Sequence, residues 1–139
     1  KGAILGLTLS TTKSDLVKAV LEGISFEIKH NLNLLALAGV EINEIRAIGG
    51  GAKSEKWLQL KADIFGKNVV ALDVSEGVCM GAAILAGTAI GKYDSVREAV
   101  QTLIHPKKVY EPDPQQRQRY LGRMETYTRI YDAIKPVTP

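Results

Sequence analysis

The sequence predicts an α/β fold that is rich in helix and has only a few short strands. Two short segments, 44–48 and 68–72, have the composition of buried strands, and they alternate with segments whose apolar residues recur at helical spacing. Such alternation is typical of α/β proteins. The 139 residues correspond to one domain, and the strands are too few for a complete doubly wound sheet.

The first half of the chain is expected to hold two strands separated by a long helix. Residues 4–9 alternate loosely enough to form a short strand. The three hydroxyl residues at 10–12 offer N-caps, and a helical apolar stripe runs from there to Gly39, a C-cap residue. Residues 44–48 then form a buried strand.

The middle of the chain repeats this alternation. Ser54 is expected to cap a second helix, whose apolar face includes Trp57 and Ala62 and which ends at Gly66. The second buried strand, at 68–72, follows directly.

The last third is expected to be mainly helical. A third helix, rich in glycine and alanine, covers about 78–90, and Asp94 or Ser95 caps a fourth. Residues 105–112 are extended and contain two prolines. Pro114 begins a last, polar helix, at a position where proline is tolerated.

The composition excludes several functional classes. A hydrophobic fraction of 45% supplies a core and excludes intrinsic disorder. A net charge of +3 is too mild to indicate nucleic acid. The single cysteine, Cys79, excludes a disulfide framework within the chain and indicates a reducing compartment. Two histidines, His30 and His105, make His-based metal centres and catalytic triads poor candidates.

The apolar stretch from Val78 to Ile90 is shorter than the roughly 20 residues that a membrane helix needs. No targeting signal is visible, and the chain starts at Lys1 without a methionine. We therefore expect it to be a piece of a longer protein.

The most informative segment is the triple glycine at 49–51, between a strand and a helix. Bare backbone at the carboxyl end of a strand lies where open α/β sheets bind ligands, and it lets a nucleotide approach the main chain. The helix that begins near Ser54 directs free N–H groups toward the same crevice, which suits an anion. The spacing matches neither a Walker A motif nor a dinucleotide fingerprint, so a plain tight turn is an equal alternative. Lys53 and Lys56 are either phosphate ligands or solvated first-turn residues.

A second feature is the run of small residues from 77 to 91. Gly77 and Gly81 lie four residues apart, so in a helix they share a face that another backbone can approach closely. Helix packing is the preferred explanation. We interpret Glu76 as an acid favoured by the helix dipole, and Cys79 as a buried small hydrophobe.

Several segments together resemble the C-terminal domain of the FGGY carbohydrate kinases. They are GGGAKSEKWLQ at 49–59, ADIFG at 62–66, Glu76, GAAILA at 81–86, GAILGLT at 2–8, AVLEG at 19–23 and YEPDP at 110–114. The resemblance covers essentially the whole chain, in order. The pattern Gly-Gly-Gly-Ala-X-Ser…Trp is most similar to xylulokinases and their close sugar-kinase relatives, and less similar to glycerol kinases.

This resemblance implies an actin/hexokinase-like (ribonuclease H-like) ATPase fold, in which two α/β domains close over a cleft. Such enzymes transfer the γ-phosphoryl group of MgATP to a sugar or polyol hydroxyl in the cytoplasm. Residues 1–139 are then the C-terminal, nucleotide-binding portion, and the N-terminal sugar-binding domain is absent. ATP and Mg²⁺ are the implied cofactors of the full-length parent, with a xylulose-like ketose favoured as the substrate.

The resemblance also implies which residues face the nucleotide. These cofactor-binding candidates are Gly49, Gly50, Gly51, Ala52, Glu55 and Lys56. Glu55 and Lys56 match positions near the adenine and ribose, where some relatives carry asparagine, whereas Trp57 and Ala62 match core packing. The Asp that serves as the family's base belongs to a motif upstream, so no catalytic or metal-binding residue is assigned. Because phosphoryl transfer needs positioning, metal and base together, the isolated chain is expected to be inactive.

A second hypothesis is a stand-alone, non-catalytic binding or interaction module with an actin-like half-fold. Under the first hypothesis the partners are ATP and, through the missing domain, a sugar, with neither nucleic acid nor membrane. An exposed apolar face would favour self-association, so a homo-oligomer is possible.

Overall fold

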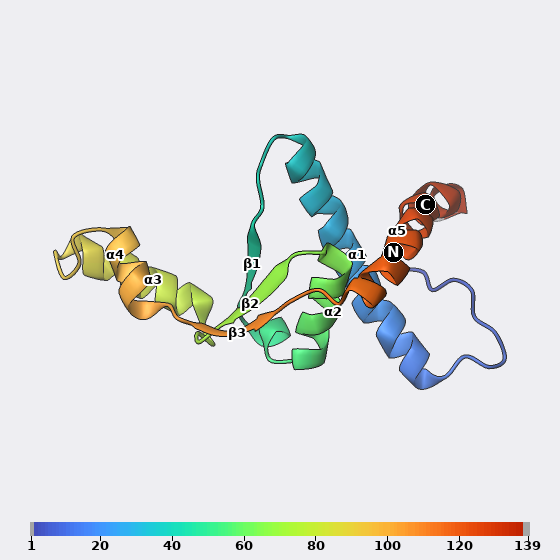
Figure 1. The fold of residues 1–139 in the computed structure, drawn as a ribbon, viewed down its shortest axis with the longest axis horizontal. Coiled ribbons are helices and arrows are strands. Elements are labelled where there is room, and N and C mark those ends of the chain that lie inside the picture. Colours follow the sequence, from blue (N-terminus) through green and yellow to red (C-terminus); the bar gives the residue numbers. More distant parts are fainter. Residues whose placement is uncertain (1, 138–139) are drawn as a thin grey trace. The chain divides into compact units, whose positions relative to one another are not determined.

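A computed structural model describes residues 2–137 of the chain, without the side chains of Tyr131 and Val137. The chain divides into two compact units. Their helices and strands are labelled in Figure 1. The first unit holds the chain up to Ile42, the short segment Asp63–Gly66 and the chain from Pro112 onward. The second unit holds Asn43–Ala62 and Lys67–Glu111. Both ends of the predicted domain span 1–139 lie outside the described residues.

The second unit is built on a three-stranded sheet in the order β1-β2-β3. β1 (Glu44–Ala47) runs parallel to β2 (Asn68–Leu72), and β3 (Pro106–Tyr110) runs antiparallel to β2. The three central residues of β2 are buried, as predicted. The prediction that the strand at 44–48 is buried is wrong, because β1 lies at the sheet edge and alternates exposed and half-buried residues.

β3 was expected only to be extended, and it proves to be a paired strand. Its exposed lysines obscure the alternation that marks a strand, and only Tyr110 is buried. Pro106 is tolerated because it occupies the first position of an edge strand.

Most helices of the second unit match their predicted positions closely. The 3₁₀ helix η1 (Gly50–Ala52) precedes α2 (Glu55–Phe65), whose last three residues belong to the first unit. α3 (Gly77–Ala89) packs against α4 (Val96–Leu103), and the Ser95 side chain caps α4 by accepting a hydrogen bond from the Glu98 backbone N–H at 3.1 Å.

The close approach of another backbone, expected at Gly77 and Gly81, is not found among the described residues: a Cβ atom on Gly81 would meet no atom within 4 Å, and the group nearest to Gly77 is a side chain. A Cβ atom there would collide with the Ile48 side chain. The predicted burial of Cys79 is wrong, because its side chain is exposed. Of the α3 residues, Ile84 is the buried one, so α3 hides a narrower face than its apolar composition suggests. No helix in the described part of the chain combines the length and apolarity needed to cross a membrane.

The first unit contains two long helices, α1 (Lys13–Leu37) and α5 (Pro114–Ile134), followed by a 3₁₀ helix, η2 (Lys135–Val137). Thr12 caps α1 in a capping box with Asp15, and the hydrogen bonds from Thr12 lower the pKa of Asp15. The strand expected at 4–9 does not form. Those residues are exposed and pair with no strand among the described residues, and a lone strand gains no ladder hydrogen bonds.

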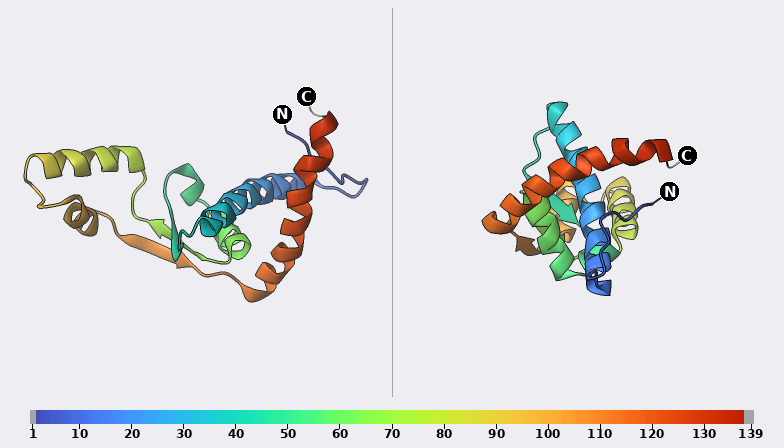
Figure 2. Two further views of the ribbon diagram at one scale, coloured as in Figure 1. Left: turned by 90° about the horizontal axis from the view of Figure 1, so that it is seen from above. Right: turned by 90° about the vertical axis from the view of Figure 1, so that its right-hand side faces the viewer.

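α1 and α5 cross each other (Figure 2), and an aromatic cluster lies at their contact. Phe26, only 6% exposed, lies against Tyr120 and Tyr127, with ring centroids 6.0 and 5.3 Å away. Polar groups surround the rings: Glu22 accepts hydrogen bonds from the Tyr120 hydroxyl and from Arg123, each at 3.0 Å. Tyr120 and Tyr127 therefore serve packing between α1 and α5.

Candidate functional site

The triple glycine forms a single tight turn at the carboxyl end of β1. Gly49 has φ +76°, a backbone conformation that residues with a Cβ rarely adopt. The turn closes through two backbone hydrogen bonds, from Ala52 N–H to the Gly49 carbonyl at 3.0 Å and from Lys53 N–H to the Gly50 carbonyl at 3.2 Å. Glycine is thus required at Gly49 by the backbone itself.

The other two glycines meet different surroundings. A Cβ atom on Gly51 would lie 3.3 Å from Cζ3 of Trp57, which is tight packing. A Cβ atom on Gly50 would meet no atom within 4 Å, and the φ of Gly50 is ordinary. The protein itself therefore leaves open space beside Gly50.

Ser54 starts α2 directly after this turn, as predicted. Its hydroxyl accepts a hydrogen bond from Trp57 N–H at 3.4 Å, and its carbonyl accepts one from Leu58 N–H at 3.0 Å. Glu55 lies in the first turn, where the helix dipole favours an acid. Leu58 and Ala62 are buried, which confirms the packing role expected of Ala62.

A cavity of about 300 Å³ opens beside the turn. Three segments line it: the turn and the start of α2, the end of β2 with the loop that follows, and β3. The lining residues are Gly49, Ala52, Lys53, Glu55, Ala71, Leu72, Asp73, Val74, Ser75, Lys107, Lys108 and Tyr110. This volume is at the lower end of the range for small-molecule sites, about 300–1,000 Å³.

The structure brings together some of the predicted nucleotide residues at this cavity but not all. Gly49, Ala52 and Glu55 line it. Gly50 and Gly51 belong to the same turn but not to the cavity wall, and Lys56 is exposed outside it. Lys53 and Lys56 were each expected to be either a phosphate ligand or a solvated residue. Of the two, Lys53 lines the cavity.

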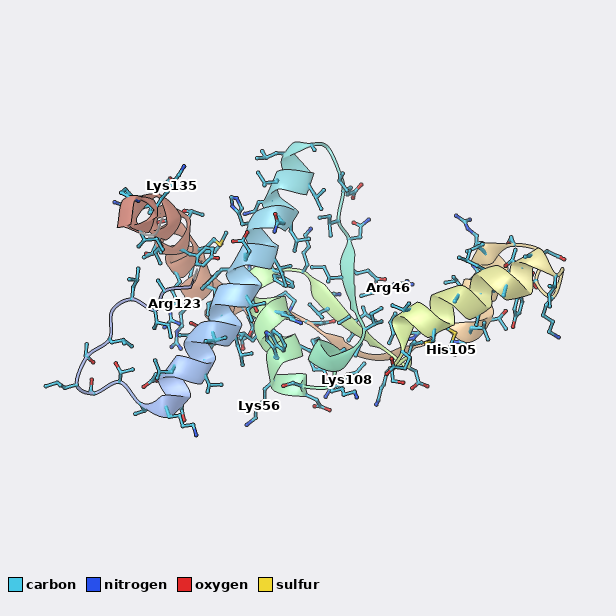
Figure 3. The ribbon with its side chains drawn as sticks, turned by 180° about the vertical axis from the view of Figure 1, so that it is seen from behind. Arg46, Lys56, His105, Lys108, Arg123 and Lys135 are labelled. Carbon is cyan, nitrogen blue, oxygen red and sulfur yellow. The ribbon has the colours of Figure 1, made fainter. Side chains whose placement is uncertain are left out.

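Lys108, labelled in Figure 3, forms an ion pair with Glu55, and both residues line the cavity. Lys108 Nζ on β3 lies 2.7 Å from Glu55 Oε2 on α2 and 5.0 Å from the centroid of the Tyr110 ring. The hydrogen bond from Lys108 lowers the pKa of Glu55, and the same bond raises the pKa of Lys108. Three lysines and two carboxylates line the cavity, so the local charge is positive.

Sequence reasoning missed the β3 side of this site. Lys107, Lys108 and Tyr110 were assigned to an extended segment without a role. The two consecutive lysines are the sequence feature that could have indicated this side of the site. They indicate it only once β3 is known to pair with β2, whose end lines the same cavity. Nowhere in residues 2–137 do three or more His, Cys, Asp or Glu side chains form a group that could hold a metal ion.

The chain is similar to known proteins over nearly its full length. The C-terminal domain of the FGGY family of carbohydrate kinases matches residues 1–90. A xylulose kinase from Staphylococcus epidermidis is 38% identical over 138 residues, which is 99% of this chain and 28% of the relative. The chain thus spans little more than a quarter of the length of the curated relatives it matches.

Solved structures agree with this match. The ligand-bound xylulose kinase from Lactobacillus acidophilus superposes with a TM-score of 0.86 at 30% identity, covering 97% of this chain and 27% of that one. The glycerol kinase of Plasmodium falciparum, solved with ADP, gives a TM-score of 0.74 at 27% identity over 91% of this chain and 26% of that one. The predicted fold class, a helix-rich α/β part of an actin/hexokinase-like ATPase domain, is confirmed.

Proposed function

Since the chain belongs to the FGGY family of carbohydrate kinases, we propose that it forms the nucleotide-facing C-terminal part of an ATP-dependent sugar kinase. The full-length enzyme transfers the γ-phosphoryl group of ATP to a hydroxyl of a sugar, and a xylulose-like ketose is the favoured substrate. The 38% identity to a xylulose kinase over nearly the whole chain supports this choice. The sugar-binding residues belong to the rest of the parent protein.

The observation that carries the proposal is the glycine turn with its adjoining cavity. Gly49, Ala52 and Glu55, three of the six cofactor-binding candidates, line the cavity together. Lys53 and Lys107 add positive charge, which suits a polyphosphate. The structural likeness to a glycerol kinase solved with ADP supports an adenine nucleotide as the ligand.

The contribution of this chain is binding and orientation. Phosphoryl transfer depends on placing the γ-phosphate in line with the attacking hydroxyl, and backbone that approaches the nucleotide closely restricts its position. Mg²⁺ would enter with ATP, because this ion is usually bound through substrate phosphates together with one or two carboxylates. Because ATP is the proposed phosphoryl donor, a cytoplasmic location follows from the same proposal.

A non-catalytic binding module is the alternative. The curated relatives that match nearly the whole chain are kinases, which favours the enzyme. The two functions are separated by assaying the full-length protein for ATP-dependent phosphorylation of xylulose. A protein that binds ATP without phosphorylating any sugar would support the module instead.

Substitution of Gly50 tests the nucleotide site directly. Gly50 has ordinary backbone angles and open space where a Cβ atom would lie, so the fold accommodates Gly50→Val. If ATP lies against this turn, the valine obstructs it, and the KM for ATP rises about ten-fold or more, while the KM for the sugar changes little. The measurement is steady-state kinetics of the full-length enzyme with each substrate varied.

Gly122→Ala on α5 is a matched control, because a Cβ atom on Gly122 also meets no atom within 4 Å. This variant should keep both KM values. Because Gly50 belongs to the turn and not to the cavity wall, an unchanged KM for ATP in Gly50→Val would contradict contact between the nucleotide and the turn.

A further inference from the structure

We propose that Lys108 is a positioning residue for the nucleotide: it holds the Glu55 carboxylate at the cavity wall, where that carboxylate accepts hydrogen bonds from the ribose hydroxyls of ATP. The inference rests on the proposed function in one respect, that the cavity beside the glycine turn takes a nucleotide. It goes further by assigning a role to Lys108 on β3, a residue that lies outside every segment that carried the resemblance.

The first step is that Lys108 itself is anchored. Its backbone belongs to β3 and is paired with Ala71 of the buried central strand. Its ammonium group lies 5.0 Å from the centroid of the Tyr110 ring, and Tyr110 is only 6% exposed. A cation over a fixed ring gains electrostatic attraction. The Lys108 ammonium therefore occupies a place set by the sheet.

The second step is that Glu55 needs this anchor. The Glu55 side chain is 71% exposed and belongs to the first turn of α2, so without a partner it would be free to adopt many rotamers. Lys108 binds Oε2 at 2.7 Å. A charge-assisted bond of this length confines the carboxylate to the cavity that both side chains line.

The third step concerns what a confined carboxylate recognises. An ionised carboxylate only accepts hydrogen bonds, so it pairs with hydroxyl donors and repels phosphate. Among the parts of ATP, the ribose offers two adjacent hydroxyls. Lys53 and Lys107 line the same cavity and supply the positive charge that the phosphates need.

The experiment compares ATP with 2′-deoxyATP in the full-length protein, using calorimetry for affinity and steady-state kinetics. Lys108→Met should weaken ATP binding about three- to ten-fold. Binding of 2′-deoxyATP should weaken less than about two-fold, because that ligand lacks one of the hydroxyls. The kcat at saturating ATP and the KM for the sugar should not change. Lys108→Arg, which keeps the charge and the hydrogen bond, should restore most of the ATP affinity.

Arg46→Met is the matched control. Arg46 on β1 forms an ion pair with Glu44 at 2.7 Å, also exposed and in the same unit, but neither residue lines the cavity. Its loss should leave the affinity for both nucleotides unchanged. A general effect of removing an exposed ion pair would instead appear in both variants.

The outcomes separate this inference from the proposed function. If Lys108→Met affects ATP and 2′-deoxyATP equally, or affects neither, the positioning role is overturned even when the wild-type protein phosphorylates a sugar. If the wild type binds ATP but phosphorylates no sugar, the proposed function fails, and the comparison of the two nucleotides still decides the role of Lys108. If the wild type binds neither nucleotide, both are overturned.

Discussion

The interactions that stabilise the first unit internally differ in kind from those that stabilise the second unit. In the first unit, side chains join helices that are far apart in sequence: Tyr120 and Arg123 of α5 bind Glu22 of α1, and Phe26 packs between two tyrosines. In the second unit, backbone hydrogen bonds join three strands, and the side chains of β3 face a cavity. In the first unit, polar side chains join the helices to each other. In the second unit, several polar side chains line the cavity instead.

This difference explains where the candidate site lies. Tyr120, Tyr127 and Arg123 already have partners within the first unit. In the second unit, the backbone ladder carries much of the structure, and the chain leaves β1 at a bare glycine turn. Substitutions in the first unit should therefore change stability, and substitutions around the glycine turn should change nucleotide binding.

The largest effect is expected from Phe26→Ala in the first unit. Removing a buried ring that contacts Tyr120 and Tyr127 should lower the free energy of unfolding by about 3 kcal/mol. Urea unfolding of the full-length protein measures the loss. The KM for ATP of the folded variant should stay at the wild-type value. A large rise in that KM with normal stability would remove the distinction between the units.

A smaller effect is expected from Gly66→Ala. Gly66 belongs to the first unit and directly follows the last residue of α2. Gly66 has φ +63°, and a Cβ atom there would collide with the Arg117 guanidinium, which donates to the Gly66 carbonyl at 2.7 Å. The strained backbone alone should cost about 1–2 kcal/mol in the free energy of unfolding.

Gly122→Ala is the control for this change as well. It lies within a helix, has open space around it, and should stabilise the protein by about 0.5–1 kcal/mol. Equal unfolding midpoints for the two alanine variants would show that neither the backbone angle nor Arg117 matters at Gly66.

An effect confined to alkaline pH, and absent near neutral pH, is expected from the tyrosine hydroxyls. Burial and the hydrogen bond to Glu22 raise the pKa of Tyr120 from 10.0 to about 12. Burial and the hydrogen bond to Glu27 raise the pKa of Tyr127 from 10.0 to about 12. The folded state therefore keeps these protons at a pH where the unfolded chain has lost them. The stability they contribute is complete below pH 10 and is lost as the pH rises toward 12.

Urea midpoints measured by circular dichroism across this alkaline range test the expectation. The variants Tyr120→Phe and Tyr127→Phe have no phenol to titrate at these positions, so the decline of the midpoint with pH should be shallower than in the wild type. A decline of the same steepness in both variants would assign the alkaline loss to other groups.

Local signals predicted most of the elements correctly. Thr12 and Ser95 cap helices because a side-chain oxygen can satisfy a free N–H a few residues away, and this geometry is written in consecutive residues. Gly39, Gly66 and Gly91 follow helix ends with positive φ for an equally local reason. Residues 4–9 were mispredicted because a strand depends on a partner, which a local pattern does not supply.

The candidate site divides in the same way. Gly49, Ala52 and Glu55 were predicted from one continuous segment, and they do line the cavity. Lys108 lies 53 residues from Glu55 along the chain, and no spacing rule connects them. Cys79 was assigned to a core from the apolar composition of its helix, but the face that α3 buries lies elsewhere.

The sequence by itself determined the helix limits, the glycine turn and the resemblance to sugar kinases, because caps, positive φ and motifs depend on neighbouring residues. Only the tertiary structure decided which distant side chains meet. The register of β3 on β2 brings Lys108 to Glu55, and the crossing of α1 and α5 brings Phe26 to Tyr127. Such meetings are set by how whole elements pack, since the free energy of packing depends on surfaces that the chain assembles only on folding.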